Sequence, residues 1–454
     1  MIKNKKQLLH FNTCVKARRL VLDALDAALM ASDPKKLVKE HVRLKGNNLR
    51  IADKTYQLDF DNIYVIGAGK ASAYMAEAMN EILGERITDG LVIIPDYFRT
   101  RLHVGNIKLW RGTHPIPSER GVYGTRKMLG LVKDVSADDL VICLLSGGAS
   151  ALMPLPFENI TIAQKSKVTN MLLRSGATIQ EINAVRKHIS AIKGGRLAEF
   201  LSRSKLVSLI ISDVVGDRLD TIASGPTAPD DTTFRDVMDV LKKYGLWETL
   251  DQNVKDVVMK GLSGIIPETP KAGSKVFRNV SNFVIGNNRL ACMGAINYIK
   301  SKKLKPVLLT TFMQGEAKEV GSVISSIALQ INAGNGSFRK PICVIMGGET
   351  TVTVRHGGKG GRNQELVLSA SRQIDGLKNT VIASIDTDGI DGNSEAAGAI
   401  ADSSTFSRAH KLKISLSEFL HNNDSNTFFT KLNDVIKTGS TGTNVNDIVV
   451  MLCL

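Results

Sequence analysis

Residues 347–365 combine glycines with charged side chains in a pattern that could bind an anion. The segment follows the apolar run Ile342–Met346, carries four glycines around Lys359 and reaches Arg362, where helical apolar spacing begins. Glycines at the start of a helix let backbone N–H groups approach an anion, and the helix dipole and a nearby cation add favourable charge. A flexible surface hairpin would have the same composition, so both interpretations stay open for this segment alone.

A second glycine-rich turn, Gly67-Ala68-Gly69-Lys70, separates an apolar run typical of a buried strand from a segment with helical spacing. It satisfies neither of two known phosphate-binding motifs. A dinucleotide fingerprint needs an acid about 20 residues on, whereas the nearest candidate, Asp96, comes later, and a P-loop needs Gly at position 64, which is Tyr. What remains is a lysine at a helix N-terminus, suited to a phosphate; a solvated lysine on a tight turn is the alternative.

A third turn, Ser146-Gly147-Gly148-Ala149-Ser150, follows the apolar run Asp139–Leu145. Its serines offer hydroxyl groups, but the chain has no Gly-x-Ser-x-Gly elbow, which argues against a serine hydrolase. Basic residues follow in the helical stretch 161–200, among them Arg186 and Lys193. Such a cluster usually lies on a solvated face, but its place just after two anion-type turns favours contact with a ligand.

Carboxylates also follow expected strands. Asp213 follows the run Leu206–Ile211, and Asp386, Asp388 and Asp391 follow Val381–Ile385. Mg²⁺ takes one or two carboxylates together with waters and phosphate oxygens, so Asp386 and Asp388 form a plausible metal site. The alternatives are a plain Asx-turn or a fragment of an EF-hand loop, although Ala397 stands where that loop needs glutamate.

The elements that must position these residues alternate between strand and helix. Strands at 62–66, 91–95, 139–145 and 206–211 with helical segments between them predict a doubly wound, mostly parallel sheet. In that architecture ligands bind outside the carboxyl ends of the strands. A stretch rich in Gly, Pro and Lys at 265–274 predicts a domain boundary, which gives an N-terminal domain of residues 1–260 and a C-terminal α/β domain of residues 275–454.

The composition limits the classes of ligand that the protein is expected to bind. A net charge of +15 over 454 residues attracts anions, but only 5% of residues are aromatic and no basic block is interleaved with them, which favours small anions over nucleic acid. The five scattered cysteines form no Cys-x-x-Cys pair, which argues against zinc and disulfides and for a reducing, cytoplasmic location. No apolar run reaches the roughly 18 residues of a membrane span. The oligomeric state is unreadable from the pattern, and a homodimer is one assembly that it allows.

Anion-binding turns, a lysine and an arginine from different domains, and a carboxylate cluster are the parts that phosphoryl transfer needs. The chain resembles the glycerate 2-kinase family in several stretches that occur in the family's order, from about residue 16 to residue 450. They include VIGAGKAS, THPIPSE, LLSGGASALMPLP, INAVRKHISAIKGGRLA, GGETTVTVR with GGRNQE, DTDGIDG and TGTNVND. The resemblance implies a Rossmann-like N-terminal domain, a C-terminal domain of the MOFRL type and an active site in the cleft between them.

It also implies an activity: ATP- and Mg²⁺-dependent transfer of the γ-phosphoryl group to the 2-hydroxyl of D-glycerate, giving 2-phosphoglycerate. Lys70 and Arg362 match the catalytic lysine and arginine of the family, and Asp213 is a candidate base. Asp386 and Asp388 would hold Mg²⁺, or one of them would accept the hydroxyl proton. The expected substrate and nucleotide contacts are Gly67, Gly69, Ser146, Gly147, Gly148, Ser150, Arg186, Lys193, Glu349, Asn363 and Asn444.

Two other functions fit parts of the pattern. The Gly67 turn and the same substrate class would suit an NAD(P)-dependent reductase acting on hydroxypyruvate or glycerate, and the two-domain frame would suit a non-catalytic protein that binds phosphorylated metabolites. The incomplete dinucleotide motif and the carboxylate cluster weigh against both. The chain departs from the family at three loop positions, Ser118, Val215 and Ser440, which bear on loop rigidity and not on reaction class.

Overall fold

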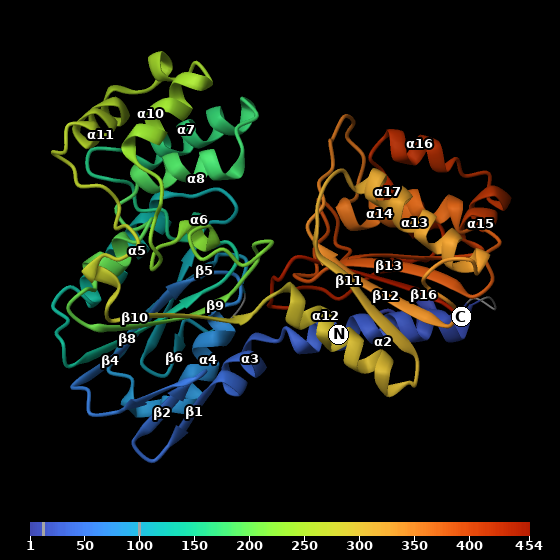
Figure 1. Cartoon of the computed structure of the whole chain (residues 1–454), viewed down its shortest axis with the longest axis horizontal. Helices are drawn as coiled ribbons and strands as arrows, with labels where there is room; N and C mark the ends of the chain where they lie inside the picture. The colour runs from blue at the N-terminus through green and yellow to red at the C-terminus, as the bar shows by residue number, and fades with distance from the viewer. Residues whose placement is uncertain (11–13, 99–100) are drawn as a thin grey trace. The chain divides into compact units, whose positions relative to one another are not determined.

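The computed structural model describes residues 1–10, 14–98 and 101–454, and the chain forms two compact units. One unit is Pro34–Ile285, and the other joins Met1–Asp33 to Gly286–Leu454. Each unit has its own sheet and its own buried apolar core (Figure 1). No helix within the described ranges is long and apolar enough to cross a membrane.

A seven-stranded sheet in the order β10-β9-β8-β4-β5-β7-β6 forms the centre of the unit Pro34–Ile285. Strand β4 pairs in parallel with β5 and β8, and β7 and β9 extend the parallel arrangement on either side. The doubly wound, mostly parallel sheet is therefore confirmed. The strands of the sheet are β4 (Asn62–Ala68), β5 (Asp89–Pro95), β6 (His103–Val104), β7 (Ile107–Gly112), β8 (Asp139–Leu145), β9 (Lys205–Ile211) and β10 (Val280–Gly286).

The chain runs from β4 outward to β5 and β7, then returns to β8 and β9 on the other side of β4. The order thus reverses between β4 and β8, and their carboxyl ends form the switch point at which such sheets bind ligands. Helices α7, α8, α10 and α11 form a separate group with its own apolar core (Figure 1). The helices of this unit are α3 (Pro34–His41), α4 (Ser72–Leu83), α5 (Glu119–Leu131), α6 (Ala149–Leu152), α7 (Ile162–Arg174), α8 (Ile179–His188), α9 (Arg196–Phe200), α10 (Phe234–Lys243) and α11 (Gln252–Leu262). A small antiparallel sheet completes the unit, with strands β1 (Val42–Lys45), β2 (Asn48–Ile51) and β3 (Lys54–Gln57).

The other unit has a six-stranded sheet in the order β11-β12-β16-β13-β14-β15. Only β11 and β12 pair in parallel; the remaining pairs are antiparallel. Helices α13 and α14 cover one face, while α2 and α12 lie side by side on the other (Figure 1). The strands are β11 (Lys305–Met313), β12 (Ile342–Gly348), β13 (Thr380–Asp386), β14 (Gly398–Asp402), β15 (Val435–Ile436) and β16 (Asp447–Cys453). The helices are α1 (Lys5–Leu8), α2 (Val15–Ala31), α12 (Asn288–Ser301), α13 (Ala317–Ala333), α14 (Arg362–Gln373), α15 (Thr405–Lys411), α16 (Leu416–His421) and α17 (Ser425–Lys431).

The place of α2 corrects the predicted domain range 1–260. That range assigned the first helix to the N-terminal domain, whereas residues 1–33 belong to the unit that contains Gly286–Leu454. The physical reason is twofold. The apolar face of α2 packs against α12, β13 and β16, and the fully buried Arg18 forms ion pairs with Asp402 and Asp434. A buried arginine needs such partners, and only the later part of the chain supplies them.

Candidate active site

The turns after β4 and β8 lie beside each other at the switch point. The backbone N–H of Lys70 donates a 2.8 Å hydrogen bond to the carbonyl oxygen of Gly147, and the N–H of Ala71 donates to Oγ of Ser146 at 3.0 Å. Both strands end in apolar runs that are buried in the sheet, so their following turns emerge at the same edge. The structure therefore brings together the second and third glycine-rich turns of the sequence.

Gly67 and Gly69 make this close approach possible. Both have positive φ angles, 148° and 144°. A β-carbon at Gly67 would lie 2.0 Å from the carbonyl oxygen of Leu144, and one at Gly69 would lie 2.0 Å from Oγ of Ser146. Neither position accepts a side chain, because the obstructing atoms belong to the neighbouring strand and turn. The two glycines thus set where Lys70 leaves the sheet.

Lys70 shares its surroundings with Asp213, Gly148 and His114. A β-carbon at Gly148 would meet the His114 ring at 2.9 Å and Cγ of Lys70 at 3.4 Å, so both side chains flank this glycine. Burial raises the pKa of Asp213, while the charge of Lys70 and a hydrogen bond from the Gly148 backbone oppose the shift. Lys70 and Asp213, predicted as catalytic from different turns, are therefore electrostatic neighbours.

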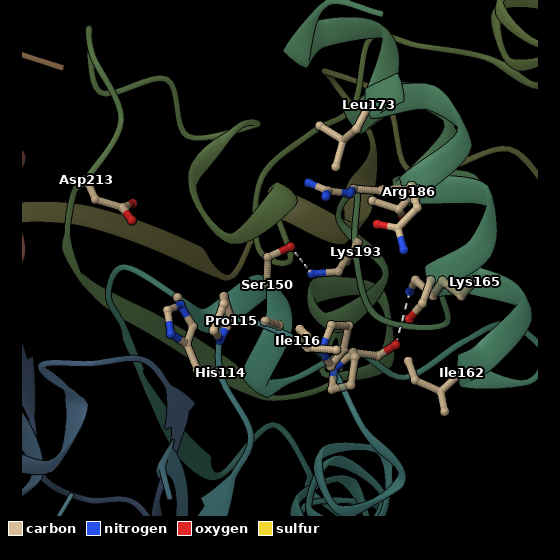
Figure 2. A pocket seen from close by; sticks show the side chains of 17 residues that line it. His114, Pro115, Ile116, Ser150, Ile162, Lys165, Leu173, Arg186, Lys193 and Asp213 are labelled. Carbon is tan, nitrogen blue, oxygen red and sulfur yellow. Dashed lines mark hydrogen bonds between the residues drawn. The ribbon is translucent and has the colours of Figure 1, made fainter. Parts of the chain in front are cut away.

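A pocket of about 480 Å³ opens beside these residues and lies wholly within the unit Pro34–Ile285 (Figure 2). Five of the predicted site residues line it: Gly148, Ser150, Arg186, Lys193 and Asp213. The loop His114–Pro117 forms another part of the lining. In Figure 2, Asp213 lies on one side, Arg186 on the other, and Ser150 and Lys193 between them. The pocket thus has a carboxylate at one end and cations at the other.

Lys193 is held at the centre of the pocket by two hydrogen bonds. Its Nζ donates to Oγ of Ser150 at 2.8 Å and to the carbonyl oxygen of Ala223 at 3.1 Å. The Ser150 hydroxyl is also 3.0 Å from Oγ of Ser224. Burial, with a smaller effect from the positive charge of Arg186, lowers the pKa of Lys193 to about 7. Near neutral pH this amine therefore changes its protonation readily.

Arg186 and Lys165 reach the pocket from two helices with well-defined starts. Helices α7 and α8 each begin in a capping box, at Thr161 and Thr178, and this fixes their first turns. Burial lowers the pKa of Arg186 and lowers that of Lys165 much further. Within the described part of the chain, no carboxylate forms a salt bridge with Lys165, Arg186 or Lys193. These cations are thus available to an anionic ligand.

Lys165 is a pocket residue that the sequence interpretation missed. It lies three residues after Ile162 and three before Val168, and both of these side chains are buried on the same face of α7. A lysine in register with a buried apolar face is the signal that could have identified it, because lysine is rarely buried without a reason.

Arg362 lies in the other unit, at the start of α14, where it binds carboxylates. Its Nε and Nη2 atoms form a bidentate pair with Asp447 at 2.6 and 2.9 Å, and Nη2 also contacts Asp386 at 2.8 Å. The remaining nitrogen, Nη1, lies 3.4 Å from Glu349, whose side chain is 44% exposed. These carboxylates raise the pKa of Arg362 against the opposing effect of burial. Asp447 is the second residue that the sequence interpretation missed, although it closes the quoted stretch TGTNVND.

The N-terminus of α14 already binds an anionic group of the protein itself. The carboxylate of Asp391 accepts hydrogen bonds from the backbone N–H groups of Asn363 and Gln364, at 3.0 and 2.9 Å. The loop before the helix is tied down as well, since the N–H of Lys359 donates to Asp424 and that of Gly360 donates to Asn393. This corrects the first interpretation of residues 347–365: the helix start binds a side-chain carboxylate in this structure and is neither a free phosphate cradle nor a loose hairpin.

The two asparagines predicted to bind substrate or nucleotide have internal partners. The side chain of Asn363 is buried, donates to Asp391 and Asp447 and accepts from the Ser384 hydroxyl, so it orients the carboxylates beside Arg362. Asn444 is half-buried, and its Oδ1 lies 3.4 Å from the N–H of Asn446. The predicted site residues thus form one cluster in each unit.

Asp386 and Asp388 lie at the carboxyl end of β13, with the N–H of Asp388 donating to Asp386 at 3.1 Å. Burial and the charges of Asp388 and Asp447 raise the pKa of Asp386 well above its usual range. No group of three or more Asp, Glu, His or Cys side chains in the described ranges is placed so that it could hold a metal ion. The excess negative charge nevertheless fits Mg²⁺ in its common form, bound by one or two carboxylates and completed by water and phosphate oxygens.

Both parts of the chain are similar in sequence to known proteins. Residues 20–259 match the family described as a domain of unknown function, DUF4147, and residues 342–447 match the MOFRL family. A glycerate 2-kinase from Pyrococcus horikoshii is 38% identical over 96% of this chain and 97% of its own length. An Agrobacterium vitis protein provisionally named hydroxypyruvate reductase is 40% identical over 86% of this chain and 98% of its own.

A solved structure extends the similarity to the fold. The crystal structure of a glycerate kinase from Thermotoga maritima matches with a TM-score of 0.85 and 38% identity, and the match covers 96% of this chain and 99% of that one. Both parts of the chain are therefore matched, in sequence and in fold. The chain belongs to the glycerate 2-kinase family of phosphotransferase enzymes.

Proposed function

We propose that this chain is a kinase that transfers the γ-phosphoryl group of ATP to the 2-hydroxyl of D-glycerate, giving 2-phosphoglycerate and ADP. The observation that carries the proposal is the pocket at the switch point, where Arg186 and Lys193 lie opposite Asp213 and form no salt bridge with any described residue (Figure 2). The charge of Lys70 acts on the same Asp213. The names of the similar proteins support the same substrate class. The five cysteines are all unpaired, which agrees with a cytoplasmic location.

The acceptor binds in this proposal with its carboxylate toward Arg186 and Lys193 and its 2-hydroxyl toward Asp213. The hydroxyl oxygen forms a bond to the γ-phosphorus, the bond from that phosphorus to the β–γ bridging oxygen breaks, and ADP leaves with the bonding electrons. The hydroxyl proton passes to Asp213. Burial makes this carboxylate more basic than an exposed one, which suits it as the proton acceptor.

Lys70 stabilises the negative charge on the transferred phosphoryl group in this proposal. Its position is set by Gly67, Gly69 and the hydrogen bond to Gly147, so little rearrangement is needed when charge develops. The hydroxyl groups and backbone of the Ser146–Ser150 turn provide further contacts to phosphate or carboxylate oxygens.

Arg362 is proposed to assist from the second unit. Its Nε and Nη2 atoms are engaged with buried carboxylates, whereas Nη1 lies 3.4 Å from the exposed Glu349. A phosphate oxygen would replace Glu349 at Nη1 while the pair with Asp447 keeps the guanidinium in place. Asp386 and Asp388 would hold Mg²⁺, which neutralises charge on the ATP phosphates when bound.

One measurement tests the proposal directly. The purified protein is incubated with ATP, Mg²⁺ and D-glycerate, and the products are followed by ³¹P NMR. The expected result is the phosphomonoester signal of 2-phosphoglycerate together with ADP in equal amount. Signals from 3-phosphoglycerate would refute the assigned position, and release of inorganic phosphate alone would refute the transfer to glycerate.

The name of the Agrobacterium vitis relative makes a reductase the second candidate. A reductase would consume NADH or NADPH when hydroxypyruvate is added, with no need for ATP. The turn Gly67–Lys70 lacks the acid that a dinucleotide fingerprint places about 20 residues on, which disfavours this candidate. Loss of NAD(P)H absorbance in the presence of hydroxypyruvate would support it.

A further inference from the structure

Lys165 is a lysine whose charge the surrounding protein does not neutralise. Its side chain is 5% exposed and lines the pocket that contains Arg186 and Lys193 (Figure 2). Its Nζ donates to the carbonyl oxygens of Pro154 and Leu155, at 3.1 and 3.4 Å. Two carbonyl groups satisfy two of the three donors of an ammonium group and carry no net charge. When the amine is protonated, one donor and its positive charge are therefore left for another group.

The neighbouring charges make this arrangement costly without a ligand. Lys193 and Arg186 both lower the pKa of Lys165, and burial lowers it most. The pocket lining contains one carboxylate, Asp213, and no salt bridge joins it to Lys165 in the described chain. A surface lysine would avoid this cost, as Lys167 on the same helix does with Asp251. An anion that binds in the pocket would offset this cost, which explains why a lysine lies there beside two other cations.

We propose that Lys165 is an anion-binding residue of the substrate pocket, which together with Arg186 and Lys193 recognises the carboxylate or phosphate of the ligand. The inference rests on the proposed function for the identity of the ligand, but the chemistry it needs is only that of a small anion. Anion entry favours the protonated amine, so binding is coupled to proton uptake by the pocket. The cluster thereby selects acceptors that carry a negative group, since a neutral polyol leaves the charges unpaired.

Two variants separate binding from structure. Lys165→Gln keeps N–H donors for the carbonyl groups of Pro154 and Leu155 but removes the charge, whereas Lys165→Met removes both. Lys167→Met is the matched control, because Lys167 is exposed on the same helix and pairs with Asp251. Calorimetry with D-glycerate, and separately with inorganic phosphate, gives the dissociation constant, and thermal unfolding reports the fold.

The expected result is that Lys165→Gln unfolds close to the wild-type midpoint yet binds both anions roughly 10- to 100-fold more weakly, the loss typical of one charged hydrogen bond. In steady-state assays KM for D-glycerate rises by a similar factor while KM for ATP changes little. Wild-type binding, measured in two buffers of different ionisation enthalpy, takes up protons, and the variant takes up fewer. Lys167→Met behaves as wild type in every measurement.

Two outcomes overturn the inference. One is a Lys165→Gln protein that binds D-glycerate and phosphate as the wild type does with unchanged proton uptake, because Lys165 is then structural. The other is a wild-type protein that binds neither anion. If the wild type binds inorganic phosphate in a Lys165-dependent way but makes no phosphoglycerate, the proposed function fails and the inference stands.

Discussion

Arg362 and Asp447 form a bidentate ion pair, with Nε and Nη2 of the arginine 2.6 and 2.9 Å from the two carboxylate oxygens. Asp447 is 1% exposed, so the pair lies largely out of water. It joins the first residue of α14 to the first residue of the last strand, which are separated by 85 positions in the chain. The pair therefore fixes both the start of the helix and the orientation of the guanidinium.

Asp447→Ala removes the bidentate partner of Arg362, which keeps its contacts with Asp386 and Glu349. We expect a loss of unfolding free energy of about 1.5–3 kcal/mol, the usual contribution of a hydrogen bond to a charged group. Urea unfolding of the purified variant measures this loss. Glu395→Ala is the control, since Glu395 is exposed in the same unit, and its unfolding curve should match the wild type. Equal curves for both variants would show that the ion pair contributes nothing to stability.

Lys70→Met tests the charge proposed to act on the phosphoryl group. We expect kcat to fall roughly 10²–10³-fold, as for removal of one preorganised donor, while the unfolding midpoint stays near that of the wild type. ADP release with saturating D-glycerate measures the rate. The exposed Lys133 provides a control substitution, Lys133→Met, that should leave kcat unchanged. A Lys70→Met enzyme with normal turnover would remove Lys70 from the mechanism.

Gly69→Ala tests whether the two turns must touch. The new β-carbon would lie 2.0 Å from Oγ of Ser146 at a φ of 144°, so we expect a loss of about 2–4 kcal/mol in stability. Gly130→Ala is the opposite case: Gly130 lies in helix α5, and apart from that helix's own backbone and the adjoining residues nothing lies within 4 Å of its β-carbon position. That variant should gain about 0.5–1 kcal/mol. Thermal unfolding midpoints of the two variants measure these effects. Equal midpoints would contradict the claim that a β-carbon at Gly69 is too close to Ser146.

Lys193, with its pKa lowered to about 7, gives anion binding a defined pH dependence. The amine must be protonated to attract an anion, so affinity for inorganic phosphate should weaken as the pH rises above about 7. The stability of the unliganded protein changes in the opposite sense. The unfolded chain keeps its lysine protonated up to about pH 10.4, so it binds more protons than the native state between about 7 and 10.4, and native stability rises with pH in that window.

Lys193→Met provides the reference for both effects. As the pH rises through this window, the wild type should lose affinity for phosphate and gain unfolding free energy relative to the variant. Calorimetry and urea unfolding at several pH values measure the two differences. A variant with the same pH profile as the wild type would assign the dependence to another group.

The sequence allowed the switch-point turns to be predicted because their position follows from sheet topology. Gly67, Gly69 and Ser146 each follow an apolar run, and parallel strands place the ends of such runs at one edge. The start of α14 at Arg362 was predicted for a similar reason, since helical spacing begins there. Local patterns were enough in both cases.

Contacts between residues that are far apart in the chain could not be predicted from such local patterns. The sequence shows Asp391 and it shows the glycines before Arg362. It does not show that the carboxylate of Asp391 accepts a hydrogen bond from the backbone at the start of the helix that follows these glycines. In the same way it shows Arg18 in an amphipathic helix without its partners Asp402 and Asp434, which lie 384 and 416 residues later. Lys165 was missed because it belongs to no recognised motif, although its spacing from Ile162 and Val168 places it on the buried face of α7.

The packing of α2 against β16 has a consequence for biosynthesis. Strand β16 is synthesised after every other strand of its sheet, yet it lies in the middle of that sheet, between β12 and β13. Helix α2 precedes β16 by more than 400 residues and cannot pack against it until β16 has been synthesised. Residues 34–285, in contrast, are contiguous and can fold while translation continues. In a nascent chain halted before residue 447, residues 34–285 should therefore be folded. The segments on either side of that unit should be sensitive to protease.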